Sequence, residues 1–261
     1  MEVIICASAR ESAALAADAI ERLVGREPEA VLGLATGSSP LGVYDELARR
    51  VRAGRFTLSR ARAFLLDEYV GLPSGHDQSY RSVIHRDLVS RVDLEPARVL
   101  GLDGTAADVV AECATYEDAI GRAGGVDLQL LGLGSDGHIG FNEPGSSLAS
   151  RTRIKTLTSR TRKDNARFFG GDPHAVPWHC LTQGIATILE ARHLVVIASG
   201  PAKAEAVRQL AEGPVSASWP ATALQLHRHV TVLVDPEAAS RLTRRDQYTE
   251  TYEGKPAWQD L

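Results

Sequence analysis

Residues 132–144, which read GLGSDGHIGFNEP, decide the prediction of the fold. An apolar run at 128–131 leads into this stretch, and its glycines and proline keep the chain irregular beyond it. An apolar strand followed by a Gly-rich loop is typical of parallel α/β sheets, which carry their chemistry on loops at the carboxyl ends of strands. We therefore expect Asp136, His138 and Glu143, which lie in this loop, to belong to a functional site.

The same loop contains a false match to a nucleotide-binding motif. The letters GLGSDG at 132–137 follow the dinucleotide fingerprint G-x-G-x-x-G directly after a strand. That fingerprint needs a helix at its third glycine and an acidic residue about 20 positions later. Gly140 and Pro144 follow too soon for a helix, and residues 153–155 are basic where the acidic residue should lie. The sequence therefore argues against a dinucleotide site.

The composition is that of an ordinary globular protein. The chain has 261 residues, of which 44% are apolar and 24% charged, and its net charge is -4. This balance argues against a general nucleic-acid or membrane binder. Residues 1–7 lack the basic start of a targeting signal, and no apolar run approaches the ~18 residues of a membrane span. The three scattered cysteines, Cys6, Cys113 and Cys180, indicate reduced, mostly buried thiols in a cytoplasmic protein.

Predicted strands and helices alternate along the chain. Strands are expected at 3–6, 30–34, 63–66, 99–102, 128–131, 154–157, 194–198 and 230–234. Helices are expected after Ser8 and at 41–51, 79–88, 106–122, 160–169, 181–189, 202–211 and 236–242. This order predicts one α/β domain over residues 1–261, Rossmann-like and doubly wound, with a mostly parallel sheet and helices on both faces. The polar tail, 236–261, is expected to be a flap or an interface segment.

A predicted anion site follows the strand at 30–34. It consists of Thr36, Gly37, Ser38 and Ser39. The glycine permits a tight turn, Ser39 is a good N-cap, and Pro40 fits the first position of a helix. Such a helix presents free backbone N–H groups and the positive end of its dipole, for which a phosphate is the natural ligand. A plain capped helix without a ligand is the alternative.

Basic residues farther along the chain extend this hypothesis. In SGPAK, residues 199–203, a strand ends, a glycine turns the chain and Lys203 stands at a helix start, where its charge is unfavourable unless an anion compensates. Residues 151–167 hold seven basic side chains and one acidic one, Asp164, and this cluster could bind phosphorylated metabolites or RNA. RNA-binding surfaces usually interleave aromatic residues, and only Phe168 and Phe169 lie near. A solvated lysine and a solvated basic face are the alternatives.

An acid–base pair is the second expected part of the site. Asp67 and Glu68 follow the strand at 63–66, and a carboxylate there could move a proton to or from carbon near a bound phospho-sugar. A helix cap or a salt bridge is the alternative for Asp67. A histidine oriented by carboxylates, as His138 would be, suits proton transfer between oxygens. The spacing D-x-H-x4-E fits no familiar metal site, and no nucleophile for a hydrolytic triad is evident.

Three motifs together resemble those of glucosamine-6-phosphate deaminases. They are LDEYVGL at 66–72, GSDGHIGFNEP at 134–144 and SLASRTR at 147–153, and the turn ATGSSP at 35–40 agrees with them. The resemblance covers nearly the whole chain and is weakest at the two ends. It implies the conversion of glucosamine 6-phosphate and water to fructose 6-phosphate and ammonia in amino-sugar catabolism. It implies no metal and no organic cofactor.

The resemblance also implies roles for individual residues. Asp67 resembles the base that takes the proton from C2 of the sugar and delivers it to C1. His138 resembles the residue that opens the sugar ring, with Asp136 and Glu143 as its carboxylate partners. The phosphate contacts of the family correspond to Thr36, Gly37, Ser38, Ser39, Arg167 and Lys203.

Some members of this family are hexamers activated by N-acetylglucosamine 6-phosphate. Their effector site resembles Ser146, Arg153 and Lys155, completed by a neighbour's N-terminus and a C-terminal tyrosine, here Tyr248 or Tyr252. The resemblance therefore implies a homo-oligomer, with a hexamer among the candidates, and an effector site on this chain.

Three other functions are compatible with parts of the sequence. The first is a 6-phosphogluconolactonase-like hydrolase of the same broad fold, but the DEY motif together with GHIGFNEP favours the deaminase. The second is a non-catalytic sugar-phosphate sensor, which would need a DNA-binding segment that the residues before Val3 and after Val234 do not suggest. The third is RNA binding through residues 151–167, which strongly salt-dependent RNA retention would reveal.

Overall fold

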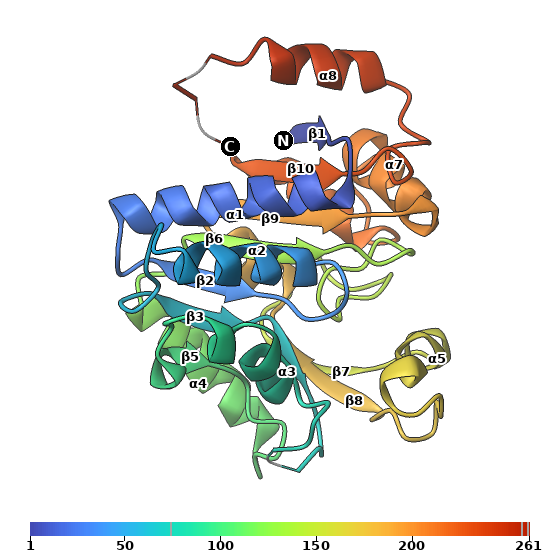
Figure 1. Ribbon diagram of the computed structural model, residues 1–261. Helices are drawn as coiled ribbons and strands as arrows, with labels where there is room; N and C mark the ends of the chain where they lie inside the picture. Colours follow the sequence, from blue (N-terminus) through green and yellow to red (C-terminus); the bar gives the residue numbers. More distant parts are fainter. Residues whose placement is uncertain (74, 257, 260) are drawn as a thin grey trace.

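A seven-stranded sheet forms the centre of the protein, whose computed structural model describes residues 1–73, 75–256, 258–259 and 261 (Figure 1). The strand order is β1-β10-β9-β6-β2-β3-β5, and every pairing is parallel. Because both faces of such a sheet are covered, its strands are mostly apolar. The strands are β1 (Glu2–Ile5), β2 (Val31–Leu34), β3 (Arg62–Leu65), β5 (Val99–Leu100), β6 (Leu128–Gly132), β9 (His193–Ala198) and β10 (Val230–Val234). The predicted parallel α/β sheet is confirmed.

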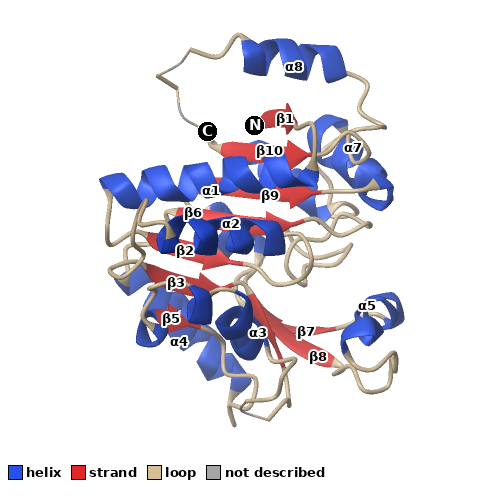
Figure 2. Cartoon of the chain, in the orientation of Figure 1, coloured by secondary structure: helices blue, strands red, loops and turns tan. Residues whose placement is uncertain are grey.

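Helices cover both faces of this sheet (Figure 2). On one face, α1 (Ala9–Arg26) and α2 (Leu41–Arg52) contribute to one buried apolar cluster. A second cluster, on the other face, includes residues of α4 (Val109–Arg122) and α7 (Ala204–Glu212). The other helical segments are α3 (Tyr80–Asp87), α5 (Ser159–Asn165), α6 (Ile185–Leu189), α8 (Arg245–Glu253), η1 (Val89–Arg91), η2 (Pro96–Arg98), η3 (Ala166–Phe168), η4 (Pro201–Lys203) and η5 (Pro220–Leu226).

A second, smaller sheet projects from the carboxyl end of β3. It has three antiparallel strands in the order β4 (Asp67–Tyr69), β8 (His179–Thr182) and β7 (Arg153–Thr156). The predicted strand at 154–157 therefore belongs to this sheet and not to the central one. The helix predicted at 181–189 is wrong in its first residues, where β8 ends, and helical only from Ile185. A short apolar run cannot be assigned to strand or helix by periodicity alone.

Side-chain caps explain two of the helix starts. Ser8 accepts a hydrogen bond from the backbone N–H of Glu11 at 3.2 Å, and the Glu11 carboxylate accepts the N–H of Ala7 at 2.6 Å, one residue before the N–H that it would take in a capping box. Ser79 accepts the N–H of Ser82 at 3.2 Å at the start of α3. The predicted starts after Ser8 and at Ser79 are confirmed.

Two other starts differ from the prediction. The N-cap of α2 is Pro40, without a side-chain cap, so the prediction that Ser39 caps this helix is wrong by one residue. The helix predicted from residue 106 begins at Val109, because the Asp108 carboxylate accepts the N–H groups of Val110 and Ala111, each at 3.0 Å.

The C-terminal tail packs beside the edge strand β1. The helix predicted at 236–242 is wrong, and the tail instead forms α8, which lies next to β1 in Figure 1. The ammonium of Lys255 lies 2.7 Å from the carboxylate of Glu2 and ties the end of this segment to the strand. Residues 257 and 260 of the tail lie outside the described residues. Its role as a flap or an interface stays a prediction.

The cysteines and the lengths of the helices among the described residues agree with the sequence predictions. The three cysteines, Cys6, Cys113 and Cys180, are free and buried. Among the described helices, none is long and apolar enough to cross a membrane.

The strand order locates the site. In the sheet, β3 and β5 lie on one side of β2, whereas β6, β9, β10 and β1 lie on its other side. The loops after β2 and β6 therefore leave the sheet in opposite directions and open a crevice between them. In parallel α/β sheets such a crevice at the carboxyl ends of the strands is where ligands bind.

Candidate functional site

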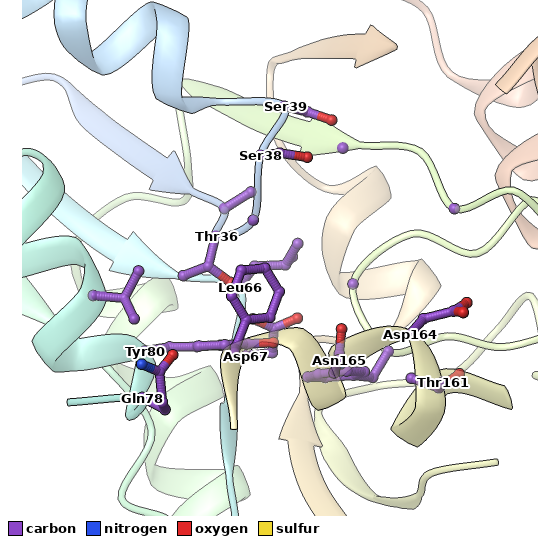
Figure 3. A pocket seen from close by; sticks show the side chains of 18 of the residues that line it. Thr36, Ser38, Ser39, Leu66, Asp67, Gln78, Tyr80, Thr161, Asp164 and Asn165 are labelled. Atoms are coloured by element: carbon purple, nitrogen blue, oxygen red, sulfur yellow. The ribbon is translucent and has the colours of Figure 1, made fainter. Parts of the chain in front are cut away.

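A pocket of about 390 Å³ lies at this crevice (Figure 3). The loop after β2, the β3–β4 junction, the loop after β6, α3, α5 and η4 line it. The sequence prediction named eight residues that the structure brings together in its lining: Thr36, Gly37, Ser38, Ser39, Asp67, His138, Arg167 and Lys203.

One end of the pocket is suited to an anion. Gly37 has a φ of +94°, a conformation that residues with a Cβ rarely adopt, and the turn there carries Ser38 and Ser39 into the lining. The N-terminus of α2, a helix of 12 residues, follows directly. A Cβ added at Gly132 would lie 3.6 Å from the Ser39 hydroxyl oxygen, so the loops after β2 and β6 are in contact here. Backbone N–H groups at such a helix start favour a phosphate.

Two cations complete this end of the pocket. Lys203 and Arg167 line it, and neither forms an ion pair with another of the described residues. Burial, followed by the positive charge of Arg167, lowers the pKa of Lys203. The charges of Asp136 and Asp164 act on Lys203 in the opposite direction, but neither cation has an ion-pair partner among the described residues, so a bound anion would neutralise them.

Asp67 is a buried carboxylate without partners. Its side chain lies at the start of β4, the residue is only 6% exposed, and no hydrogen bond from the described residues reaches its carboxylate. Burial and then the negative charge of Glu68 raise the pKa of Asp67 well above its ordinary value. A carboxyl group with a raised pKa that faces a pocket is suited to accept and return a proton.

His138 is oriented by a carboxylate, as predicted. Its Nδ1 lies 2.6 Å from Oδ1 of Asp136. Burial would raise the pKa of Asp136, but the hydrogen bond and charge of His138 lower it to about 2. Because the carboxylate is ionised and accepts, Nδ1 carries the proton between them, and Nε2 is the ring nitrogen left for a ligand. The loop holds the ring tightly, since a Cβ at Gly134 would overlap it.

Glu143 has a different set of contacts from the one expected. Its hydrogen bonds join it to the backbone N–H of Thr158, to the Thr158 hydroxyl, each at 3.2 Å, and to the hydroxyl of Thr161. These residues cap and begin α5. The buried Glu143 carboxylate therefore holds the start of α5, and no hydrogen bond to His138 is found among the described residues. Among the described residues, Asp136 supplies the carboxylate contact of the histidine.

Sequence reasoning missed the aromatic wall of the pocket. The rings of Tyr80 and Phe141 stack with centroids 5.9 Å apart and planes within 5°, and Tyr69 lies 4.9 Å from Tyr80. Figure 3 shows Tyr80 beside Asp67 and Asn165 across from them. Asn165 donates a hydrogen bond of 3.0 Å to the Tyr69 hydroxyl. No local pattern in the sequence distinguishes Tyr80 and Asn165, because α3 and α5 reach the pocket only through the fold.

The basic cluster at 151–167 does not form one surface. Arg151 pairs with Glu117 and Glu190, whereas Arg162 is buried and donates to backbone carbonyls of Val176 and Pro173. Of the basic residues in the cluster, Arg167 lines the pocket, together with the acidic Asp164. Because Arg151 and Arg162 are engaged elsewhere, the described residues of the cluster do not form the continuous positive face that RNA binding requires.

The residues expected at an effector site lie outside the pocket. Ser146 is buried, and its hydroxyl has no hydrogen-bond partner among the described residues. Arg153 donates to the Asn142 side chain at 3.0 Å, and burial lowers its pKa. Lys155 lies two residues farther along β7. Tyr248 lies on α8 and donates to Glu212 at 3.4 Å.

A metal site is not evident in the part of the chain that the structure describes. There, no group of three or more histidine, cysteine, aspartate or glutamate side chains is placed to hold an ion.

Comparison with known proteins finds relatives that match the whole chain. A family model described as glucosamine-6-phosphate isomerases/6-phosphogluconolactonase matches residues 6–233. Curated proteins named glucosamine-6-phosphate deaminase, from Beutenbergia cavernae and Mycolicibacterium smegmatis, are 65% and 64% identical over 261 residues, with both chains fully covered.

Solved structures give the same result for the fold. A monomeric glucosamine-6-phosphate deaminase is 43% identical, with a TM-score of 0.90 over 92% of this chain and 100% of that one. The 6-phosphogluconolactonase of Trypanosoma cruzi is 22% identical, with a TM-score of 0.72 over 93% of this chain and 97% of that one, a likeness of fold alone. The chain belongs to the family of glucosamine-6-phosphate isomerases and 6-phosphogluconolactonases.

Proposed function

We propose that the protein is a glucosamine-6-phosphate deaminase, which converts glucosamine 6-phosphate and water to fructose 6-phosphate and ammonia. The observation that carries the proposal is the pocket itself, which combines an anion site, the buried Asp67 carboxylate and the Asp136–His138 pair. Relatives named for this activity are 57–65% identical over the full chain. The solved structures described as 6-phosphogluconolactonases, at 19–24% identity, support only the fold, so a lactonase reaction is not favoured.

The phosphate of the sugar would occupy the end of the pocket formed by the turn at 36–39, Arg167 and Lys203. Backbone N–H groups at the α2 start and the two cations provide charge-assisted hydrogen bonds there. Binding the phosphate at this end places the sugar ring toward His138 and Asp67. The binding energy of this non-reacting group then orients C1 and C2 for the reaction.

Ring opening and carbon proton transfer fall to different residues. Nε2 of His138 moves a proton from the C1 hydroxyl to the ring oxygen, which opens the sugar to an amino aldehyde. Asp67 then removes the proton from C2 and returns it to C1. In the same conversion the amino nitrogen loses one proton and O1 gains one, so that C1 carries a hydroxyl and C2 a carbon–nitrogen double bond. Water adds to C2 and ammonia leaves, so that the keto group of fructose 6-phosphate remains.

The raised pKa of Asp67 suits this role. A base is most effective when its pKa lies near the pH at which it works, since it must accept the proton and give it back. Burial in an aromatic pocket and the neighbouring Glu68 charge both act in that direction. The aromatic wall also limits access of water to C2 during the transfer.

The test of this function is the variant Asp67→Asn. It should lower kcat for ammonia release by at least about 10²–10⁴-fold, because the amide cannot accept the proton, while binding of glucosamine 6-phosphate stays near the parental affinity. Asp45→Asn, a change at an exposed residue outside the pocket, is the control and should keep parental kinetics. Near-parental turnover of Asp67→Asn would reject the proposed mechanism.

The proposal extends to the effector and to assembly. A phosphorylated N-acetyl sugar would contact Ser146, Arg153 and Lys155, which the buried, unpartnered Ser146 hydroxyl supports. In Figure 1, α8 lies at the far end of the molecule from β7, so Tyr248 would complete such a site only between subunits of a homo-oligomer. The solved relative at 43% identity is described as monomeric. Assays and sedimentation with and without N-acetylglucosamine 6-phosphate test this extension.

The proposed place of the reaction is amino-sugar catabolism in the cytoplasm. The three buried, unpaired cysteines support a reducing compartment. Fractionation of cells that express the protein with a tag would test the location.

A further inference from the structure

Glu68 ties the strand that carries Asp67 to the start of a helix. One oxygen of its carboxylate accepts the backbone N–H groups of Tyr69 at 2.8 Å and Tyr80 at 2.9 Å, and the other accepts the N–H of Arg81 at 3.1 Å. Tyr80 and Arg81 are the first two residues of α3. The Glu68 residue is only 5% exposed, so these contacts are shielded from water.

These hydrogen bonds satisfy groups that a helix cannot satisfy itself. The first N–H groups of a helix have no intrahelical partner, and a negative charge at this end is favoured by the helix dipole. Ser79 caps the N–H of Ser82, and Glu68 takes the two preceding N–H groups. Burial raises the pKa of Glu68, and the backbone donors of Tyr80, Arg81 and Tyr69 oppose that rise.

The helix start that Glu68 holds carries part of the pocket wall. Tyr80 stacks on Phe141 and contacts Tyr69, and Figure 3 shows it beside Asp67. The ring of Tyr80 therefore covers the region in which the reacting carboxylate lies. A shift of the first turn of α3 would move this ring and admit water to Asp67.

We propose that Glu68 is a positioning residue of the reaction. Its carboxylate fixes the first turn of α3 so that the Tyr80 ring stays against Asp67, and its negative charge disfavours a second negative charge on Asp67. The kinetic part of this inference rests on the proposed deaminase function. The structural part, the coupling of Glu68 to Asp67, does not.

Other titratable groups lie around the carboxylates of Asp67 and Glu68, and a substitution of Glu68 leaves them unchanged. The Glu68 charge acts on Asp67, and the Asp67 charge in turn acts on four tyrosines and a cysteine; Glu68 interacts in addition with the Arg81 guanidinium. The titratable groups in this neighbourhood are Glu68 and Tyr69 on β4, Tyr80 and Arg81 on α3, Tyr44 on α2, Tyr116 on α4 and Cys180 on β8. A change at Glu68 alone leaves all the others in place.

The experiment is a ¹³C NMR titration of the Asp67 carboxylate in the parent and in Glu68→Gln, with Asp67→Asn to assign the signal. The glutamine keeps an oxygen for the N–H groups of Tyr69 and Tyr80 but removes the charge. The titration midpoint of Asp67 should fall by about one pH unit, since a neighbouring like charge has been lost. The acid limb of kcat/KM should move down in pH by the same amount, with KM within about threefold of the parent.

Matched variants separate this role from a general loss of structure. Glu212→Gln changes a carboxylate that also accepts two backbone N–H groups, those of Thr243 and Arg244, but lies outside the pocket. It should leave both readouts unchanged. If Glu68→Gln does not fold, the same titration is made on Tyr80→Ala. Removing the Tyr80 ring exposes the Asp67 carboxylate to water, which should also lower its titration midpoint.

Two results would overturn the inference. One is a folded Glu68→Gln variant in which the midpoint of Asp67 is unmoved. The other, where Glu68→Gln fails to fold, is an unmoved midpoint in Tyr80→Ala. Absence of ammonia release by the parent would instead reject the proposed function, because the titration needs no turnover and would still report on Glu68.

Discussion

At the scale of single residues, Asp67 is held in a state that disfavours folding. Its carboxylate is buried, receives no hydrogen bond from the described residues and lies next to the Glu68 charge. A group that is costly to bury is often kept because function needs it. The same burial that raises its pKa for proton transfer should therefore reduce the stability of the folded protein at neutral pH.

The first stability prediction follows from the sign of this shift. The pKa of Asp67 is higher in the folded than in the unfolded chain. Its carboxyl group therefore does not reduce the free energy of unfolding below about pH 4, and reduces it as the pH rises through the folded pKa. Asp67→Asn should raise the free energy of unfolding by about 1–3 kcal/mol at pH 8 and by much less at pH 4. Thermal melts at both pH values measure this. A variant less stable than the parent at pH 8 would contradict it.

Lys203 gives the prediction for the anion site. Lys203→Met keeps the aliphatic stem but removes a charge-assisted contact of about 1.5–3 kcal/mol, so KM for glucosamine 6-phosphate should rise by about 10–100-fold. Lys163→Met, at an exposed position on α5, is the control and should keep the parental KM. Michaelis–Menten kinetics of ammonia release are the measurement, and an unchanged KM for Lys203→Met would remove this lysine from the site.

What the sequence predicts at this scale depends on how local the interaction is. Ser8 and Ser79 cap helices three residues ahead, so their roles can be read from the chain. Asp67 and His138 stand in distinctive motifs after strands. Glu68 acts on N–H groups 12 and 13 residues away, and the Tyr80 ring meets residues of other elements. Such contacts exist only after folding, so no pattern indicated them.

At the scale of elements, the loop after β6 places the histidine. The N–H of Gly134 donates to the carbonyl of His138 at 2.9 Å, and the ring folds back over Gly134. Only a residue without a Cβ leaves room for it. The loop thus uses its glycine to hold the ring beside Asp136, rather than to approach a nucleotide.

Gly134→Ala should therefore impair catalysis rather than binding. The added Cβ would displace the His138 ring from Asp136, so kcat should fall by about 10²-fold or more, as expected for His138→Gln, with KM near the parental value. Residual activity should remain because some substrate opens in solution without the enzyme. Gly121→Ala, on α4 with no atom within 4 Å of the added Cβ, should keep activity and gain about 0.5–1 kcal/mol of stability. Parental kcat in Gly134→Ala would contradict the role of this glycine.

Elements were predicted well where their pattern is self-contained. The parallel strands and the amphipathic helices of the central layers have such patterns. The strand β8 was misassigned because its pairing partners, Asp67–Tyr69 and Arg153–Thr156, lie elsewhere in the chain. The helix α8 was missed because it has no buried residue and therefore no apolar stripe.

At the scale of the whole molecule, the order of the strands determines where the site lies. The loops after β2 and β6 separate at the point where the strand order reverses, and the small sheet brings β4 with Asp67 to the same place. Residues from opposite ends of the chain, such as Thr36 and Lys203, meet there. The parallel sheet could be predicted from the alternation of strands and helices. The order of the strands in the sheet could not, and therefore neither could the spatial neighbours of each site residue.

Ammonia release from a panel of sugars tests the central claim most directly. The account predicts stoichiometric ammonia and fructose 6-phosphate from glucosamine 6-phosphate, little turnover of unphosphorylated glucosamine, and no hydrolysis of 6-phosphogluconolactone above the rate in buffer. Ammonia release from galactosamine 6-phosphate in the same panel measures whether the pocket also accepts the other epimer. Equal use of glucosamine with and without its phosphate, or lactone hydrolysis in place of ammonia release, would contradict the account.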